Sequence, residues 1–124
     1  MSEFNPVGWF EIPAVDLAVS QKFYQTILQI EFNILEMPPY IMAMFACDHA
    51  LPGCGGALVV GPDTAPSTSG TTIYFNSVDC ATVIGRVVAA GGKVLMEKTS
   101  IGEHGFIAMF SDPAGNKLGV HSMQ

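Results

Sequence analysis

The side chains of this sequence that could do acid–base or nucleophilic chemistry are few and widely spaced. The 124 residues include three histidines and three cysteines. His49 follows Asp48, and a carboxylate beside an imidazole can orient that ring as a general base; the alternative, which the nearby glycines and proline favour, is an exposed loop. His104, between Glu103 and Gly105, is interpreted as a solvated turn residue. Neither histidine is therefore a strong catalytic candidate by its neighbours alone.

The cysteines and a glycine-rich run point to no further chemistry. Cys47, Cys54 and Cys80 are odd in number and lack Cys-x-x-Cys spacing, which argues against a disulfide framework and a zinc knuckle. The glycine-rich residues 53–56 lack a following Lys-Ser/Thr pair and open no predicted helix, so they do not form a phosphate-binding loop. We expect free thiols in a reducing compartment.

The sequence contains two stretches with the same predicted order of helices and strands, and these elements position the candidate residues. In the first, Val19, Phe23 and Ile27 recur at helical spacing behind Asp16, a candidate N-cap. In the second, Asp79 opens a helix that carries Val83, Ile84, Val87 and Val88 on one face and ends at Gly91-Gly92. Alternation and turn residues predict strands over 7–14, 31–36, 40–47, 57–60, 71–77, 93–99, 105–111 and 117–122. Each stretch therefore has the order β-α-β-β-β.

The repetition of this order has a counterpart in the residues themselves. Val15-Asp16 and Val78-Asp79 are 63 positions apart, and Ala43-Met44-Phe45 recurs as Ala108-Met109-Phe110 after 65 positions. Matches in register with the predicted elements favour an internal duplication over chance. We predict a single domain over 1–124, with modules at about 5–61 and 70–124 joined by an exposed linker at 62–69.

Composition limits the partners of this domain. A net charge of −6 and a pI near 4.7 exclude the basic surface that nucleic acid or an anionic membrane requires. The longest apolar stretch, residues 41–47, is far shorter than the roughly 20 residues of a spanning helix. Residues 1–6 carry no signal-peptide pattern. We therefore expect a cytoplasmic protein.

The small share of charged residues predicts association. Only 13% of the residues are charged and 49% are hydrophobic, whereas a typical soluble domain is about 25% charged. So few charges cover a free surface thinly, which favours a homodimer or larger oligomer.

Two stretches resemble the vicinal oxygen chelate superfamily, which contains glyoxalase I, bleomycin-resistance proteins and extradiol dioxygenases. The first runs from Trp9 to Leu17 and is followed by Lys22-Phe23-Tyr24; the second, residues 105–122, contains the turn Asp112-Pro113-Ala114-Gly115-Asn116. The resemblance implies an α+β fold of two tandem β-α-β-β-β modules. Their strands would form a curled mixed sheet around a central cavity, with helices outside and usually two chains in the assembly.

The resemblance also implies where a metal would bind in metal-dependent members. Its first-strand ligand positions correspond here to Trp9 and Thr72, and a last-strand position corresponds to Gly119. The last strand of the first module contains no His, Asp or Glu. None of these side chains is a ligand for a catalytic divalent metal, so we predict neither a bound metal nor another cofactor.

A carboxylate and an imidazole remain as candidate catalytic groups. Residues two apart in a strand share a face, so Glu11 follows Trp9 into the implied cavity and His121 follows Gly119. Such a pair can do general acid–base work. Two alternatives remain: both residues have structural or solvated roles, or they hold a metal with waters, which is less favoured because catalytic zinc usually has three protein ligands.

The same alternation predicts the lining of the implied pocket and leaves two functions open. Phe10, Ile12, Ile73 and Phe75 are expected to pack under the helices. The pocket residues expected on the other face are Trp9, Met44, Thr72, Tyr74, Met109 and Gly119. The first function is a glyoxalase-like lyase or isomerase that uses Glu11 and His121. The second is a protein of the bleomycin-resistance type that binds a small molecule without turning it over.

Overall fold

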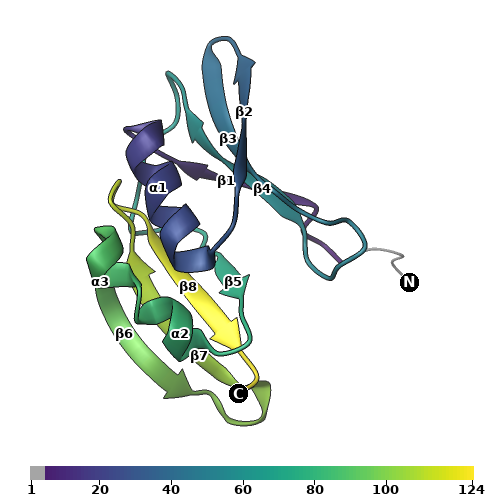
Figure 1. Cartoon of the computed structure of the whole chain (residues 1–124), viewed down its shortest axis with the longest axis vertical. Coiled ribbons are helices and arrows are strands. Elements are labelled where there is room, and N and C mark those ends of the chain that lie inside the picture. Colours follow the sequence, from purple (N-terminus) through teal and green to yellow (C-terminus); the bar gives the residue numbers. More distant parts are fainter. Residues whose placement is uncertain (1–4) are drawn as a thin grey trace.

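The computed structural model describes residues 5–124, so the first four residues, on which the signal-peptide prediction partly rests, lie outside the described residues. The first module comprises β1 (Trp9–Pro13), α1 (Leu17–Leu28), β2 (Phe32–Met37), β3 (Tyr40–Phe45) and β4 (Gly55–Val60). The second comprises β5 (Tyr74–Asn76), α2 (Cys80–Ile84), α3 (Val87–Ala90), β6 (Lys93–Ser100), a 3-10 turn (Gly102–His104), β7 (Phe106–Ser111) and β8 (Lys117–Ser122). Figure 1 shows both modules.

Each module contains one four-stranded mixed sheet, and the two sheets have the same strand order. The orders are β1-β4-β3-β2 and β5-β8-β7-β6, with the first strand parallel to the last and the other pairs antiparallel. The registers also agree. Ala57 on β4 lies between Glu11 and Met44, and Gly119 on β8 lies between Tyr74 and Met109. The tandem β-α-β-β-β fold predicted from the repeated residues is therefore confirmed.

The helices begin where the acidic residues predict. The Asp16 carboxylate accepts a hydrogen bond from the Val19 amide at 3.3 Å, and the Asp79 carboxylate accepts one from the Ala81 amide at 2.9 Å. Each side chain satisfies an amide of the first helical turn that has no partner within the helix. The first helix of each module thus begins with the same kind of N-cap.

One predicted helix is broken in the structure. The stretch from Asp79 to Gly91 forms α2 and α3, separated at Gly85 and Arg86. Glycine has a low helix propensity because its backbone is free. The Arg86 guanidinium also turns away from its own helix and donates a hydrogen bond to the Ile27 carbonyl near the end of α1, at 3.1 Å. Val88, predicted to lie on the apolar face, is 69% exposed as a result of this change of direction.

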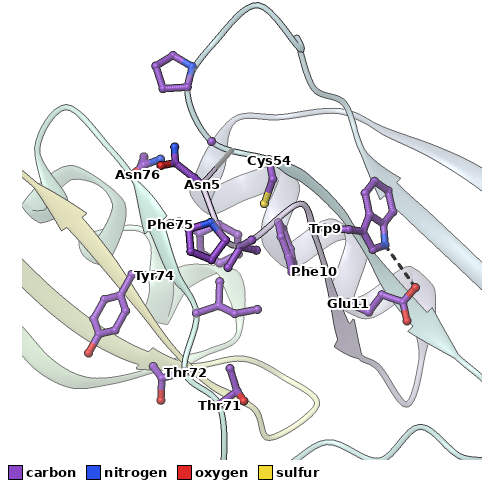
Figure 2. Close-up of a pocket in the computed structure, with 15 residues that line it drawn as sticks. Asn5, Trp9, Phe10, Glu11, Cys54, Thr71, Thr72, Tyr74, Phe75 and Asn76 are labelled. Carbon is purple, nitrogen blue, oxygen red and sulfur yellow. Dashed lines mark hydrogen bonds between the residues drawn. The ribbon is translucent and has the colours of Figure 1, made fainter. Parts of the chain in front are cut away.

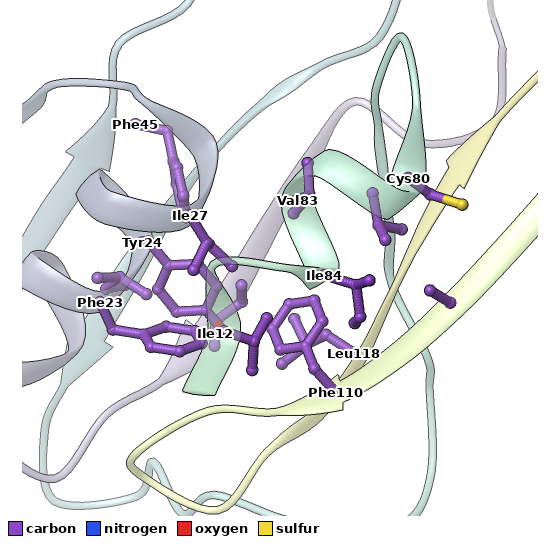
Figure 3. Close-up of a cluster of buried hydrophobic side chains, with 14 of the residues drawn as sticks. Ile12, Phe23, Tyr24, Ile27, Phe45, Cys80, Val83, Ile84, Phe110 and Leu118 are labelled. Carbon is purple, nitrogen blue, oxygen red and sulfur yellow. The ribbon is translucent and has the colours of Figure 1, made fainter. Parts of the chain in front are cut away.

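One hydrophobic core serves both modules (Figure 3). It joins Ile12, Phe23 and Ile27 of the first module to Val83 and Phe110 of the second. Helix α1 contacts α3 and α2 as well as its own sheet. The resemblance implied helices outside a curled sheet; here each module has its own four-stranded sheet, and the helices of the two modules pack on one another (Figure 1).

The helices cover one face of each sheet and leave the other uncovered. Ile12 lies in the core, and Phe10, Ile73 and Phe75 pack against it, as alternation predicts. The opposite face, here called the open face, carries Trp9, Glu11, Met42 and Met44 on the first sheet, and Tyr74, Met109, Gly119 and His121 on the second. Ligands of this chain have to be accommodated on or beside the open faces, because the other faces are filled by the core.

Within residues 5–124, neither length nor hydropathy allows any helix to cross a bilayer.

Candidate ligand site

A cavity of about 910 Å³ lies between β1 and the segment that leads into β5. Figure 2 shows Trp9 and Glu11 on one side of it and Thr72 and Tyr74 on the other. The lining residues are Asn5, Pro6, Val7, Trp9, Phe10, Glu11, Pro52, Gly53, Cys54, Thr71, Thr72, Ile73, Tyr74, Phe75 and Asn76. The cavity is large enough for a drug-sized molecule, and it is built from the corresponding first strands of the two modules.

Aromatic rings remain open to solvent in this cavity. Trp9 and Tyr74 are each 46% exposed, although both belong to regular strands. Phe10 and Phe75 meet edge to face with ring centroids 5.9 Å apart, where the core reaches the cavity. Exposed aromatic side chains around a hollow are typical of binding sites, since burying them against a ligand is favourable.

The polar groups of the cavity are few and mostly uncharged. Glu11 is the carboxylate among the lining residues, and its Oε2 accepts a hydrogen bond from the Trp9 indole nitrogen at 3.3 Å. Hydroxyls come from Thr71 and Thr72, an amide comes from Asn76, and Cys54 contributes an exposed thiol. The site can therefore hold a ligand by apolar contact, orient it by hydrogen bonds and face it with one negative charge.

His121 lies in a different hollow from Glu11. That hollow, of about 440 Å³, is lined by Tyr74, Asn76, Ile101, Ile107 and His121. The His121 ring nitrogen Nε2 lies 2.6 Å from the His104 carbonyl oxygen, so Nε2 carries the hydrogen and donates. No hydrogen bond or ion pair joins Glu11 to His121 in the described part of the chain. The structure thus supplies a hydrogen-bond partner for each residue without bringing the two together.

The remaining predicted pocket residues divide into two groups. Trp9, Thr72 and Tyr74 line the larger cavity, whereas Met44, Met109 and Gly119 line neither hollow. Gly119 lies beneath the Tyr74 ring, and a Cβ atom at that position would collide with this ring and lie 3.0 Å from the Met109 sulfur. The absence of a side chain at Gly119 therefore makes room for the Tyr74 ring.

Sequence reasoning missed several lining residues. Alternation predicts Phe10 and Phe75 in the core, and they also line the cavity, because the cavity borders the start of β1 and the short strand β5. Cys54 and Asn76 had no motif to mark them. The duplication was the usable signal: the first strands of two equivalent modules are the elements that line this cavity.

The residues present do not fit the metal site that the resemblance implies. Trp9, Thr72 and Gly119 occupy the corresponding positions, and none of them offers a carboxylate, imidazole or thiolate. Residues 5–124 contain no group of three His, Cys, Asp or Glu side chains placed to bind a metal ion. The chemistry of the site is therefore derived from Glu11, the hydroxyls and the aromatic rings.

The other chemically active residues lie away from this cavity. His49 Nε2 lies 3.9 Å from the Cys47 sulfur, and both side chains are exposed. His104 lies in the 3-10 turn, with Glu103 at 3.8 Å and both side chains largely in solvent. All three cysteines are free, as the spacing predicts, and Cys80 is buried in the core.

Sequence comparison gives a partial relative. No protein-family model matches the chain. A protein named "Putative glyoxylase CFP32", from Mycobacterium bovis (strain ATCC BAA-935 / AF2122/97) and from Mycobacterium tuberculosis (strain CDC 1551 / Oshkosh), is 28% identical over 120 residues. The match covers 91% of this chain and 44% of the mycobacterial protein. The chain therefore spans less than half the length of these relatives.

Solved structures similar to this chain share its fold at low identity. TnmS3, an antibiotic binding protein from Streptomyces sp. CB03234, has a TM-score of 0.73 and 21% identity, with 98% of each chain covered. A glyoxalase/bleomycin resistance protein from Albidiferax ferrireducens T118 has a TM-score of 0.69 and 21% identity, covering 94% of this chain and 98% of that one. Glyoxalase I from Zea mays has a TM-score of 0.70 and 21% identity, covering 95% and 46%. The fold that the resemblance implies is thus confirmed.

Proposed function

We propose that this chain is a glyoxalase-like protein that binds a small aromatic molecule in the cavity between β1 and β5 without metal-dependent chemistry. The observation that carries the proposal is the pair of half-exposed rings, Trp9 and Tyr74, on opposite sides of a cavity of about 910 Å³. A ligand in this cavity would bury exposed apolar surface of these lining rings. The similarity in fold to the antibiotic binding protein TnmS3, over 98% of each chain, is consistent with this function.

The absence of suitable metal ligands favours binding of a small molecule over metal-dependent turnover. Polarising two neighbouring substrate oxygens requires a Lewis acid, and the positions where the resemblance implies one hold Trp9, Thr72 and Gly119. The test is elemental analysis of the purified protein, followed by assay with the glutathione–methylglyoxal hemithioacetal, with and without Ni²⁺ or Zn²⁺. We expect no stoichiometric metal and no turnover. Stoichiometric metal together with turnover would contradict the proposal.

A lyase or isomerase is the second candidate, and the observation that favours it is the name of the mycobacterial relatives. Glu11 would act as general base within the cavity, while His121 would need a rearrangement to reach the same ligand. Glu11→Gln and His121→Ala, made separately, test this role. If both variants retain any turnover that the native chain shows, these two residues are not its acid and base.

We also propose that the chain works as a homodimer in the cytoplasm. The β2–β3 hairpin supports the dimer, since Ile34, Leu35, Met37 and Ile41 are 54%, 37%, 53% and 44% exposed. A hairpin with apolar side chains exposed on both faces is typical of a surface that another chain covers. Three free cysteines, two of them exposed, fit a reducing compartment.

A further inference from the structure

The charged side chains around the cavity are of one sign. Its lining residues include the Glu11 carboxylate and no Lys, Arg or His. Two of the cationic side chains are engaged elsewhere: the Lys98 ammonium binds Asp79 at 3.0 Å, and Arg86 donates to the Ile27 carbonyl. The other basic residues, Lys22, Lys93 and Lys117, lie on α1 and at the starts of β6 and β8, outside the lining. Among residues 5–124, a ligand in the cavity therefore meets a negative charge without a positive one.

Glu11 has no cation to neutralise it within the described residues. The ion pairs of residues 5–124 are Lys98–Asp79 and His104–Glu103. The contact of Glu11 is the neutral Trp9 indole N–H, which fixes the carboxylate beside the ring and leaves its charge intact. A bound cation would find an oriented carboxylate.

A second carboxylate extends the negative region. The Tyr40 hydroxyl donates a hydrogen bond to Asp63 at 2.8 Å. This bond chiefly raises the pKa of Tyr40, and the Asp63 and Glu11 charges raise it further. Both carboxylates thus raise the pKa of one hydroxyl.

The aromatic rings favour the same sign of ligand charge. The face of an indole or phenol ring is electron-rich and attracts a cation within about 6 Å of its centre, with tryptophan the strongest of the common partners. Trp9 stands beside Glu11 and Tyr74 stands across the cavity, both half-exposed. The Glu11 carboxylate and the Trp9 ring beside it therefore favour the same sign of ligand charge.

We propose that the cavity selects cationic aromatic ligands, such as quaternary N-heteroaromatic rings or aryl ammonium ions, over neutral ones, and that it rejects carboxylates. The selection rests on the proposed function, since it concerns the ligand of the same cavity. Trp9 contacts the flat ring, and Glu11, beside Trp9, faces its charge. An anionic ligand would lie against an uncompensated carboxylate, so a glutathione conjugate, with two carboxylates and one ammonium, is disfavoured.

Calorimetric titration at neutral pH with three probes of one ring system tests the selection: 1-methylquinolinium (cationic), quinoline (neutral) and quinoline-2-carboxylate (anionic). We expect 1-methylquinolinium to bind about tenfold more tightly than quinoline, and quinoline-2-carboxylate more weakly than both. Glu11→Gln should remove most of the preference for the cation and leave quinoline affinity within about twofold of native.

Glu97→Gln is the matched control, because it removes the same charge from an exposed position on β6, outside the lining and away from the β2–β3 hairpin. It should leave the preference for the cation intact. If both variants lose the preference for the cation equally, the proposal is contradicted, because the overall charge of the protein would then explain the preference. Equal affinity for all three probes would also contradict it. If none of the three probes binds, the result contradicts the proposed binding function itself, and not only the preference for cationic ligands.

Discussion

At the scale of single residues, the motif that carries the resemblance to the superfamily is a joint between modules. The Tyr24 hydroxyl donates to the Asp112 carboxylate at 2.8 Å, and Asp112 also accepts hydrogen bonds from the Ala114 amide and from the amide and side chain of Asn116. The Asn116 side chain donates in turn to the Pro13 carbonyl at the end of β1, at 2.7 Å. A carboxylate only 4% exposed is stable because these bonds satisfy it.

Removing one donor from this joint tests its contribution. Burial, and then the Asp112 charge, raise the pKa of Tyr24 well above its usual value, so its hydroxyl keeps its proton and donates. Tyr24→Phe should lower the free energy of unfolding by about 2 kcal/mol, because a buried carboxylate loses a hydrogen bond. Urea unfolding measures the change.

Tyr40→Phe is the matched control for this variant. It removes a tyrosine–carboxylate bond of the same length, 2.8 Å, from an exposed site. Water replaces a donor lost at the surface, so its effect on unfolding should be much smaller. Equal effects of the two variants would contradict the role of the joint.

At the scale of the elements, Gly119 on β8 determines how Tyr74 on β5 faces the cavity. The two residues are partners in a parallel pair of strands, and the ring lies over the glycine. Because β5 is only three residues long, few backbone bonds fix this wall of the cavity. The position of the Tyr74 ring therefore depends on the empty space at Gly119.

Filling that space should weaken ligand binding. Gly119→Ala displaces the Tyr74 ring, because the new methyl group would occupy its place, and we expect at least about a threefold loss of quinoline affinity. Gly8→Ala is the control, since no atom lies within 4 Å of a Cβ atom built there. Isothermal titration with quinoline compares the two. Unchanged affinity in Gly119→Ala would mean that Tyr74 does not form the binding surface.

The elements were more predictable than the site for a physical reason. Strand alternation and N-cap residues are local signals, and they predicted the positions of Asp16 and Asp79 and the faces of Phe10 and Tyr74. Alternation gives the face of a strand and not the hollow that the face lines. Glu11 and His121 were paired on this basis, but β1 and β8 belong to different sheets. The break at Gly85 depends on the tertiary contact of Arg86 with α1, which no local pattern contains.

At the scale of the whole molecule, the small share of charged residues is accompanied by apolar side chains that the single chain leaves exposed. The 13% of charged residues leaves apolar side chains exposed along the β2–β3 hairpin and on Trp9 and Tyr74. The hairpin projects away from the second module (Figure 1). The proposed second copy of the chain would cover these apolar side chains of the hairpin.

Sedimentation equilibrium tests this association. We expect a mass of twice the 13.2 kDa of one chain at micromolar concentration. Leu35→Lys on the hairpin should shift the equilibrium toward the monomer, because a buried ammonium without a partner is costly. Val88→Lys, on the 69% exposed residue of α3, should leave the dimer intact. A stable monomer of the native chain would contradict the proposal.

The most direct test of metal-independent binding uses the single tryptophan of the sequence, Trp9, which lies in the cavity. Its fluorescence is followed while quinoline is added to protein dialysed against a chelator, with and without added Zn²⁺ or Ni²⁺. We predict a saturable change in Trp9 emission with the same midpoint in every condition. A change that requires the metal, or the absence of any saturable change, would contradict the account.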